Sequence, residues 1–218
     1  MRNYQPLTTN GKKIDPRLEL IDTARHFYQQ NWMVGTAGNL SARLADDSFW
    51  ITASGKSKGE LTINDFVRVT LEGKVLEQAS ADVKPSAETI IHQTIYTVFP
   101  QAQACYHIHS IEANLVSHFT NGDELPLPAL EMLKGLGVWE EKPQVEMPVF
   151  ENYLEVPKIA NQISDRFRTP PRIPALLIRD HGITVWANSL LAARNYIELV
   201  EYIFRYIVAE RQINSKFL

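Results

Sequence analysis

Three histidines in this sequence have the types and spacing of ligands in a catalytic zinc site. His107 and His109 flank one isoleucine in the segment 104–110, and His181 precedes a glycine within the apolar segment 175–186. Because alternate side chains of a β-strand share a face, one strand would direct both His107 and His109 to the same side. Three neutral imidazoles leave a fourth position for water or substrate. A His-x-His triplet alone is a weak motif, but burial of unpaired polar groups is costly, which favours ligation here.

Two glutamates are candidates for proton transfer beside such a metal. Glu88 follows Ser86, the predicted N-cap of a helix that leads into the histidine strand, so we expect its carboxylate near the metal. The alternative is an exposed first-turn glutamate that the helix dipole stabilises. Glu131 has apolar neighbours on both sides, so partial burial is expected to raise its pKa and suit it to acid–base catalysis. The alternative for Glu131 is a surface salt bridge with Lys134.

Three short segments rich in small and hydroxyl residues carry the donors that a phosphate dianion needs. Their backbone N–H groups, hydroxyls, amide and cation belong to Asn39, Ser54, Gly55, Lys56 and Ser86. Such loops are also frequent turns, and the sequence has no P-loop pattern. Zinc ligands, carboxylates and anion donors together predict a site for a phosphorylated hydroxy-ketone whose carbonyl the metal polarises.

Length and composition restrict the class of protein. Of 218 residues 44% are hydrophobic, which is enough for one substantial core, and no linker divides the chain. The net charge of −3 is scattered, so we expect a small soluble partner rather than nucleic acid or a membrane. The sequence lacks a bilayer-crossing apolar run and a signal-peptide pattern, and its one cysteine, Cys105, fits a reducing compartment. We therefore expect one cytoplasmic domain over residues 1–218, with residues 1–14 loosely held.

The apolar pattern predicts helices and strands that interleave along the chain. Asp15 and Pro16 have the types of an N-cap and a first helical residue. Helices are expected over 16–32, 86–99, 159–167 and 189–213, and strands over 49–52, 67–71, 74–76, 104–110, 145–149 and on both sides of His181. Interleaved helices and strands favour a layered α/β domain, and hairpins among the strands indicate a mixed or mostly antiparallel sheet.

Five motifs occur in the order of a known protein family. They are Gly-Asn-Leu-Ser at 38–41, Ser-Gly at 54–55, Pro-Ser-Ala-Glu at 85–88, His-Ile-His-Ser at 107–110 and His-Gly at 181–182. In this order they resemble the class II aldolase and sugar-phosphate epimerase family over residues 16–210. The resemblance implies a three-layer α/β/α sandwich with a central, mixed and largely antiparallel sheet. It also implies a homotetramer whose active sites lie near subunit interfaces.

The same resemblance implies roles for individual residues. His107, His109 and His181 match the ligands of one zinc ion per subunit, Glu131 a catalytic acid–base and Glu88 the catalytic glutamate of the aldolases. The segments 131–135 and 148–152 are similar to a branch of sugar-phosphate dehydratases of methionine salvage. In that branch the zinc ion polarises a ketose phosphate, a carboxylate removes the C3 proton, and the C4 hydroxyl leaves as water. Relatives have two adjacent serines before the first glutamate, whereas this chain has alanine second, so one phosphate donor is missing.

Two other kinds of function remain open at this point. One is an aldolase that uses Glu88 to cleave the C3–C4 bond of fuculose or rhamnulose 1-phosphate, or a pentulose-phosphate 4-epimerase. The segment that contains Glu131 favours dehydration over both. The other is a scaffold without catalytic activity, such as the adducin head domain. The three intact histidines argue against a scaffold.

Overall fold

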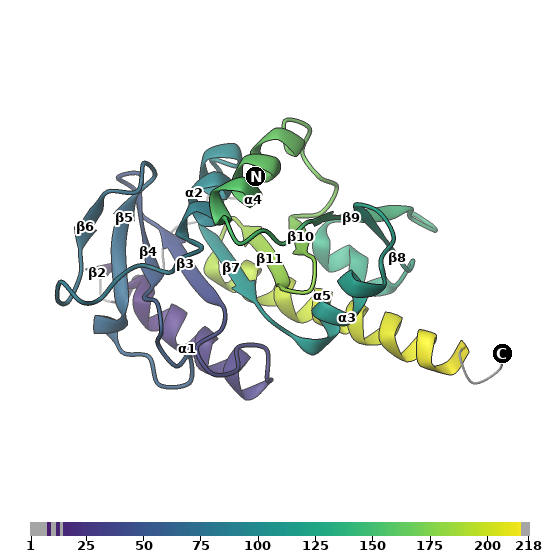
Figure 1. Cartoon of the computed structure of the whole chain (residues 1–218), viewed down its shortest axis with the longest axis horizontal. Coiled ribbons are helices and arrows are strands. Elements are labelled where there is room, and N and C mark those ends of the chain that lie inside the picture. Colours follow the sequence, from purple (N-terminus) through teal and green to yellow (C-terminus); the bar gives the residue numbers. More distant parts are fainter. Residues whose placement is uncertain (1–7, 10–11, 14, 215–218) are drawn as a thin grey trace.

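A sheet of nine strands forms the middle layer of the molecule (Figure 1). The computed structural model describes residues 8–9, 12–13 and 15–214. The strands of this sheet are β3 (Asn39–Arg43), β4 (Ser48–Thr52), β5 (Phe66–Thr70), β6 (Val75–Glu77), β7 (Ala104–Ile108), β8 (Glu124–Leu127), β9 (Val145–Phe150), β10 (Ala175–Ile178) and β11 (Gly182–Ala187). Their order is β6-β5-β4-β3-β7-β11-β10-β9-β8, and every pair is antiparallel except β9 and β10. The prediction of a mixed, largely antiparallel sheet is confirmed.

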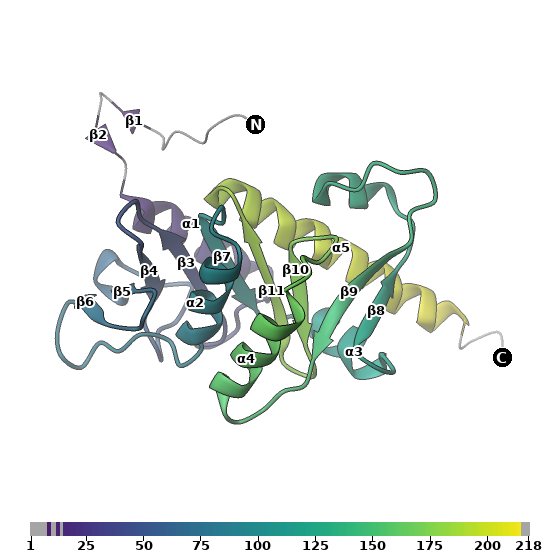
Figure 2. The ribbon, with the colours of Figure 1, turned by 90° about the horizontal axis from the view of Figure 1, so that it is seen from above.

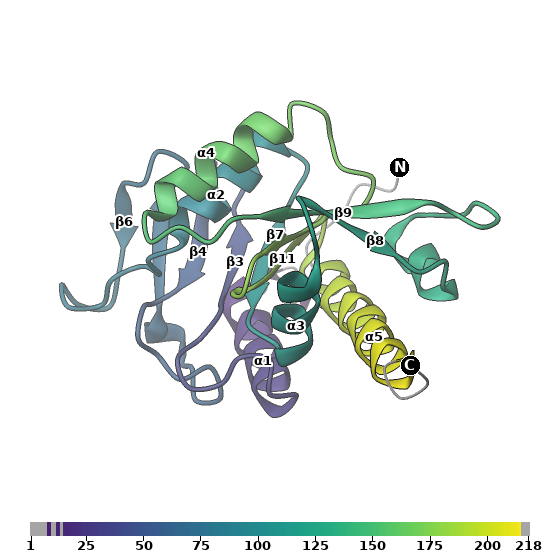
Figure 3. The same ribbon diagram turned by 45° about the vertical axis from the view of Figure 1, so that its right-hand side comes forward.

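Helices cover both faces of this sheet (Figures 2 and 3). They are α1 (Pro16–Gln29), α2 (Thr89–Val98), α3 (Ile111–Phe119), α4 (Val156–Arg166) and α5 (Leu190–Asn214), with short 3-10 helices η1 (Ile63–Asp65) and η2 (Glu131–Leu136). One face carries α2 and α4, and the other carries α1, α3 and α5, each over its own cluster of buried apolar side chains. The expected three-layer α/β/α sandwich is therefore confirmed. Among the described helices, none is both long and apolar enough to cross a membrane.

The start of the chain is only partly described. There, β1 (Thr8–Thr9) pairs antiparallel with β2 (Lys12–Lys13). Most of the segment 1–14, which the sequence predicts to be loosely held, lies outside the described residues. The predicted cap of α1 is confirmed, because the Asp15 carboxylate accepts a hydrogen bond from the backbone N–H of Arg17 at 3.0 Å.

The central strand β7 shows how the sheet separates its two faces. Tyr106 and Ile108 belong to the apolar cluster beneath α1 and α5, whereas Cys105 belongs to the cluster beneath α2 and α4. Since side chains alternate along a strand, His107 lies on the same face as Cys105. This places the predicted ligand on the side where α2 begins. Cys105 is a free, fully buried thiol, as expected of a residue of the core.

Candidate metal centre

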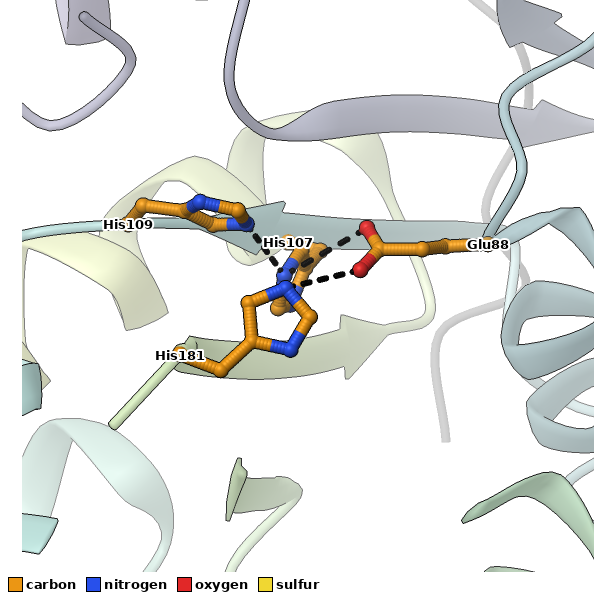
Figure 4. A group of neighbouring side chains, drawn as sticks. All are labelled: Glu88, His107, His109 and His181. Atoms are coloured by element: carbon orange, nitrogen blue, oxygen red, sulfur yellow. Dashed lines mark hydrogen bonds and ion pairs between the residues drawn. The ribbon is translucent and has the colours of Figure 1, made fainter. Parts of the chain in front are cut away.

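Four side chains meet where the central strand β7 ends: Glu88, His107, His109 and His181 (Figure 4). One potential ligand atom from each lies within 4.8 Å of all the others. Nε2 of His107 is 2.8 Å from Nε2 of His109 and 3.5 Å from a carboxylate oxygen of Glu88. Nε2 of His181 is 2.8 Å from the other oxygen of Glu88. The structure thus brings the three histidines singled out in the sequence together with one of the two predicted glutamates.

The sheet and one tight turn place the histidines. His107 is in β7, and His109 follows directly after this strand, where its backbone N–H donates to the carbonyl of Trp32 at 2.9 Å. His181 lies in the turn between β10 and β11. At the next residue, Gly182, a Cβ atom would clash with the carbonyl oxygen of Ile108. Glycine therefore lets this turn approach β7 closely enough for the third histidine to meet the other two.

His107 and His109 are uncharged, which is the state in which imidazole binds a metal. Burial lowers the pKa of His107 well below its ordinary value and lowers the pKa of His109 to about 4. The Thr184 hydroxyl is 2.9 Å from Nδ1 of His107, and an Nδ1–H bond to it leaves the Nε2 lone pair directed at the cluster. Nδ1 of His181 is buried without a hydrogen-bond partner among the described residues. Imidazole nitrogens and a carboxylate that converge in this way fit a divalent metal ion.

Glu88 reaches the cluster from the residue just before α2. The sequence predicts that Ser86 caps this helix, but α2 begins at Thr89 and Glu88 occupies the N-cap position. The prediction was wrong because a tight turn precedes the helix, in which the N–H of Thr89 donates to the Ser86 carbonyl at 3.1 Å. This turn directs the Glu88 side chain to the histidines, and only 14% of that side chain is exposed. The alternative of an exposed first-turn glutamate is therefore wrong.

Glu88 is an anion in this setting. Burial opposes its charge, but the adjacent His107 ring and hydrogen bonds from His181 and Asn39 outweigh burial and hold its pKa well below the usual range. The Asn39 amide donates to a Glu88 oxygen at 2.5 Å. A buried carboxylate with fixed donors beside three imidazoles can bind a cation or accept a proton from a bound molecule.

Glu131 lies outside this cluster. It begins η2, in the segment that extends from the β8–β9 end of the sheet (Figure 2). The expected partial burial is wrong: 75% of the side chain is exposed, and its carboxylate pairs with Lys134 at 2.8 Å. The apolar residues around it mislead because Leu133 and Leu136 turn into the core while the first residue of the short helix turns outward. Within one chain, Glu131 therefore does not join the histidines.

The residues predicted to bind phosphate occupy two kinds of position. Ser54 lies beside the turn that contains Ser86. Ala53 pairs with Pro85, and the N–H of Ser54 donates to the carbonyl of Lys84 at 2.9 Å. Gly55 is exposed, with a left-handed φ of +70° that suits glycine.

The remaining two predicted donors have protein partners. Lys56 pairs with Asp65 at 3.0 Å. Asn39 is only 2% exposed, and its amide contacts Glu88 and His92. Asn39 is thus placed to hold Glu88.

Lys58 is a buried cation near the centre that the sequence did not single out. It is 1% exposed, and its ammonium group donates to the carbonyls of Thr36 and Lys56 at 2.7 and 2.8 Å. Burial lowers its pKa to about 8, and the charge of Glu88 opposes this shift. Lys58 therefore ties together two of the small-residue loops at the site. Lys56 and Lys58 share one loop, and no local pattern distinguishes the surface lysine from the buried one.

A second buried carboxyl, Glu201 on α5, lies behind the site. It is 1% exposed, and it accepts a hydrogen bond at 2.7 Å from Ser110, the N-cap residue of α3. Burial raises its pKa from an ordinary 4.5 to about 8, and the Ser110 hydrogen bond opposes the shift. The folded protein therefore keeps a proton that the unfolded chain releases above about pH 4.5. Folding stability that is present below this pH is lost as the pH rises toward 8.

We expect Glu201→Gln to remove this pH dependence. Between pH 4.5 and about pH 8, the wild-type free energy of unfolding should fall by up to about 1.4 kcal/mol per pH unit. The reason is that the folded protein disfavours the charged form of the Glu201 carboxyl group. The variant should show a flatter profile and exceed the wild type near pH 8. Chemical denaturation over this range measures both, with Glu210→Gln, an exposed position on the same helix, as control. Equal slopes for Glu201→Gln and wild type would contradict the assignment.

A three-layer sandwich with three histidines and a glutamate at the end of its central strands defines a class of metal-binding, aldolase-like proteins. The profile of the class II aldolase and adducin N-terminal domain matches residues 18–208. The chain belongs to this family.

Individual relatives agree with the family match. The chain is 68% identical over 200 residues to methylthioribulose-1-phosphate dehydratase of Microcystis aeruginosa, covering 91% of this chain and 98% of the relative. Two crystal structures have a similar fold at 25% identity. YgbL from Escherichia coli has a TM-score of 0.76 over 89% of this chain and 88% of its own. L-fuculose-1-phosphate aldolase from Thermus thermophilus has a TM-score of 0.73 over 91% of this chain and 96% of its own.

Proposed function

We propose that the chain is a methylthioribulose-1-phosphate dehydratase of methionine salvage, in the cytoplasm, with one zinc ion held by His107, His109 and His181. The observation that carries this proposal is the cluster of three histidines in a chain 68% identical to a relative of that name. The reaction removes water from 5-methylthioribulose 1-phosphate and yields 2,3-diketo-5-methylthiopentyl 1-phosphate. When bound, the metal supplies Lewis acidity that polarises a substrate carbonyl.

The protein's own groups then have to move one proton and assist one leaving group. A carboxylate takes the proton from C3, and the C4 hydroxyl leaves as water with a proton returned to it. The enol that results tautomerises to the diketone. Glu131 is the proposed acid–base, and because it is exposed and outside the cluster of its own chain, it would act in the site of a neighbouring subunit. The proposed assembly is the homotetramer that the family resemblance implies, with active sites near subunit interfaces.

The phosphate group of the substrate would lie against the two adjacent turns beside the metal centre. Ser54, Gly55 and Ser86 offer hydroxyl and backbone donors there, and Lys56 offers a cation on release from Asp65. The sequence also predicts Asn39 as a phosphate donor. One hydrogen of its amide group is donated to Glu88, which leaves the second for the phosphate. Backbone and hydroxyl donors of this kind suit a dianion.

A second candidate function is a ketose-1-phosphate aldolase. The position of Glu88 inside the cluster favours it, since this matches the catalytic glutamate that the aldolase resemblance implies. The two functions differ in their products, because an aldolase breaks the C3–C4 bond and a dehydratase keeps all carbon atoms together.

Proton NMR of 5-methylthioribulose 1-phosphate with the zinc-loaded protein tests the proposal. We expect the C3 proton signal to disappear and signals of the diketone to appear. Retro-aldol fragments would replace the proposal with the aldolase function. If 5-methylthioribulose 1-phosphate stays unchanged and the protein instead converts fuculose or rhamnulose 1-phosphate, the aldolase function likewise replaces the proposal.

A further inference from the structure

A chain of buried polar side chains leads away from Glu88 between β3 and α2. Asn39 donates to Glu88 at 2.5 Å, and its amide oxygen is 2.5 Å from Nε2 of His92. Nδ1 of His92 is 2.6 Å from the Ser41 hydroxyl, which is 2.7 Å from the hydroxyl of Tyr96. The four residues beyond Glu88 are each no more than 2% exposed. A chain of polar side chains is costly to bury unless every hydrogen-bond donor in it has an acceptor.

The sequence spacing of these residues matches the two elements that carry them. Asn39 and Ser41 are two residues apart on β3, so both face α2. Glu88, His92 and Tyr96 are each four residues apart at the start of and along α2, so they lie on one side of it, toward the sheet. The two rows interdigitate, and together they form one continuous line of hydrogen bonds that ends at the metal centre.

The directions of these hydrogen bonds follow from the anion at one end. A carboxylate only accepts, so the amide nitrogen of Asn39 faces Glu88 and the amide oxygen faces His92. That oxygen also only accepts, so His92 must carry its proton on Nε2. Nδ1 of His92 is then an acceptor, and the Ser41 hydroxyl donates to it.

Tyr96 completes the line, because the hydroxyl proton of Ser41 is already engaged with His92 and its oxygen can accept from Tyr96 at 2.7 Å. The Cys105 carbonyl, at 3.3 Å, is the more distant acceptor for Ser41.

Burial lowers the pKa of His92 to about 4, against the attraction of Glu88, so the ring is neutral. The titratable groups that face Glu88 itself are His107, His109, His181 and Lys58.

We propose that His92 is a positioning residue for the metal centre: its Nε2–H fixes the Asn39 amide, which in turn holds the Glu88 carboxylate toward His107 and His181. The ring nitrogens of His92 hydrogen-bond to Asn39 and Ser41, so its hydrogen-bonded route to Glu88 runs through Asn39. The proposal rests on the proposed function in that Glu88 works at the centre during turnover. It makes Asn39 the link between His92 and Glu88.

The tautomer of His92 tests the proposal without any catalytic assay. Long-range proton–nitrogen NMR of the zinc-loaded protein, labelled with nitrogen-15 in histidine, distinguishes a protonated from an unprotonated ring nitrogen. The His92 signals are identified by their loss in His92→Gln. We expect a neutral ring with the proton on Nε2 at about pH 7. A proton on Nδ1, or a doubly protonated ring, would overturn the assignment.

Two substitutions of similar size separate positioning from packing. Glutamine places an amide where Nε2 stands and can still donate to Asn39, whereas asparagine reaches only the position of Nδ1 and the contact with Ser41. We expect His92→Asn to lower kcat by about 10- to 100-fold with little change in KM, and His92→Gln to recover most of that loss. Thermal unfolding of both variants shows whether they differ in stability, as a loss of packing would cause.

The outcomes distinguish this proposal from the proposed function. Equal losses of kcat in His92→Gln and His92→Asn, with equal thermal stability, would overturn the positioning role. If the protein does not dehydrate methylthioribulose 1-phosphate, the proposed function fails, but the tautomer of His92 and the relative kcat values on an aldol substrate still decide the positioning role.

Discussion

His107→Ala is expected to lose bound metal and catalytic activity together. The ring is 1% exposed at the middle of the cluster, with one nitrogen toward Thr184 and the other toward His109 and Glu88. Changes to residues that merely support a metal ligand cost about 10- to 100-fold in affinity, so the loss of a ligand should exceed about 100-fold. Metal content per chain, measured by elemental analysis after dialysis, should fall from about one to near zero.

The matched control is another histidine outside the cluster. His26 lies on α1 and pairs with Glu198 at 3.0 Å, so His26→Ala should keep metal and activity. A metal-free His107→Ala protein with full activity would rule out a metal-dependent reaction at this centre. Full metal content in His107→Ala would instead exclude His107 as a ligand.

The parts of the site that sequence predicts well depend on local geometry. The period of a strand is enough to place His107 and His109 on one side, and a histidine–glycine turn between two apolar runs is enough to present His181. The sheet then aligns these positions, since Asn39 and Thr184 are the cross-strand partners of His107 on either side. The interleaving of helices and strands is enough to indicate a layered α/β domain, and the family resemblance specifies its three layers.

The parts that sequence predicts poorly depend on contacts between distant elements. The apolar neighbours of Glu131 indicate a core nearby, but they do not say on which side of a short 3-10 helix the carboxylate lies. The line from Glu88 through His92 to Tyr96 becomes visible only once α2 is known to pack against β3. The sequence around Lys58 is that of an ordinary loop lysine, and only the folded loop shows that its side chain is buried. Burial of polar groups is thus the feature that local patterns least constrain.

Glu131→Gln is expected to keep the metal and lose most of the dehydratase activity. An amide cannot exchange the proton that a carboxyl group can, and general acid–base catalysis contributes about 10²- to 10⁴-fold. Folding should be nearly unaffected, because the side chain is 75% exposed and its ion pair with Lys134 is at the surface. Steady-state kinetics together with metal content measure this; an unchanged kcat would remove Glu131 from catalysis and leave Glu88 as the carboxylate at the centre.

Mixing two inactive variants shows whether Glu131 acts in its own chain or in a neighbour's. If it acts across an interface, assemblies of Glu131→Gln and His107→Ala chains contain some sites with every native group. Random mixing in equal amounts makes these sites up to about a quarter of the total, so about that fraction of activity should return. Because Glu88 and His107 meet within one chain, mixtures of Glu88→Gln and His107→Ala should remain inactive. Recovery in the first mixture and not in the second would therefore assign Glu131 to the neighbouring site. No recovery in either would mean that Glu131 reaches the metal centre only by a rearrangement of its own chain.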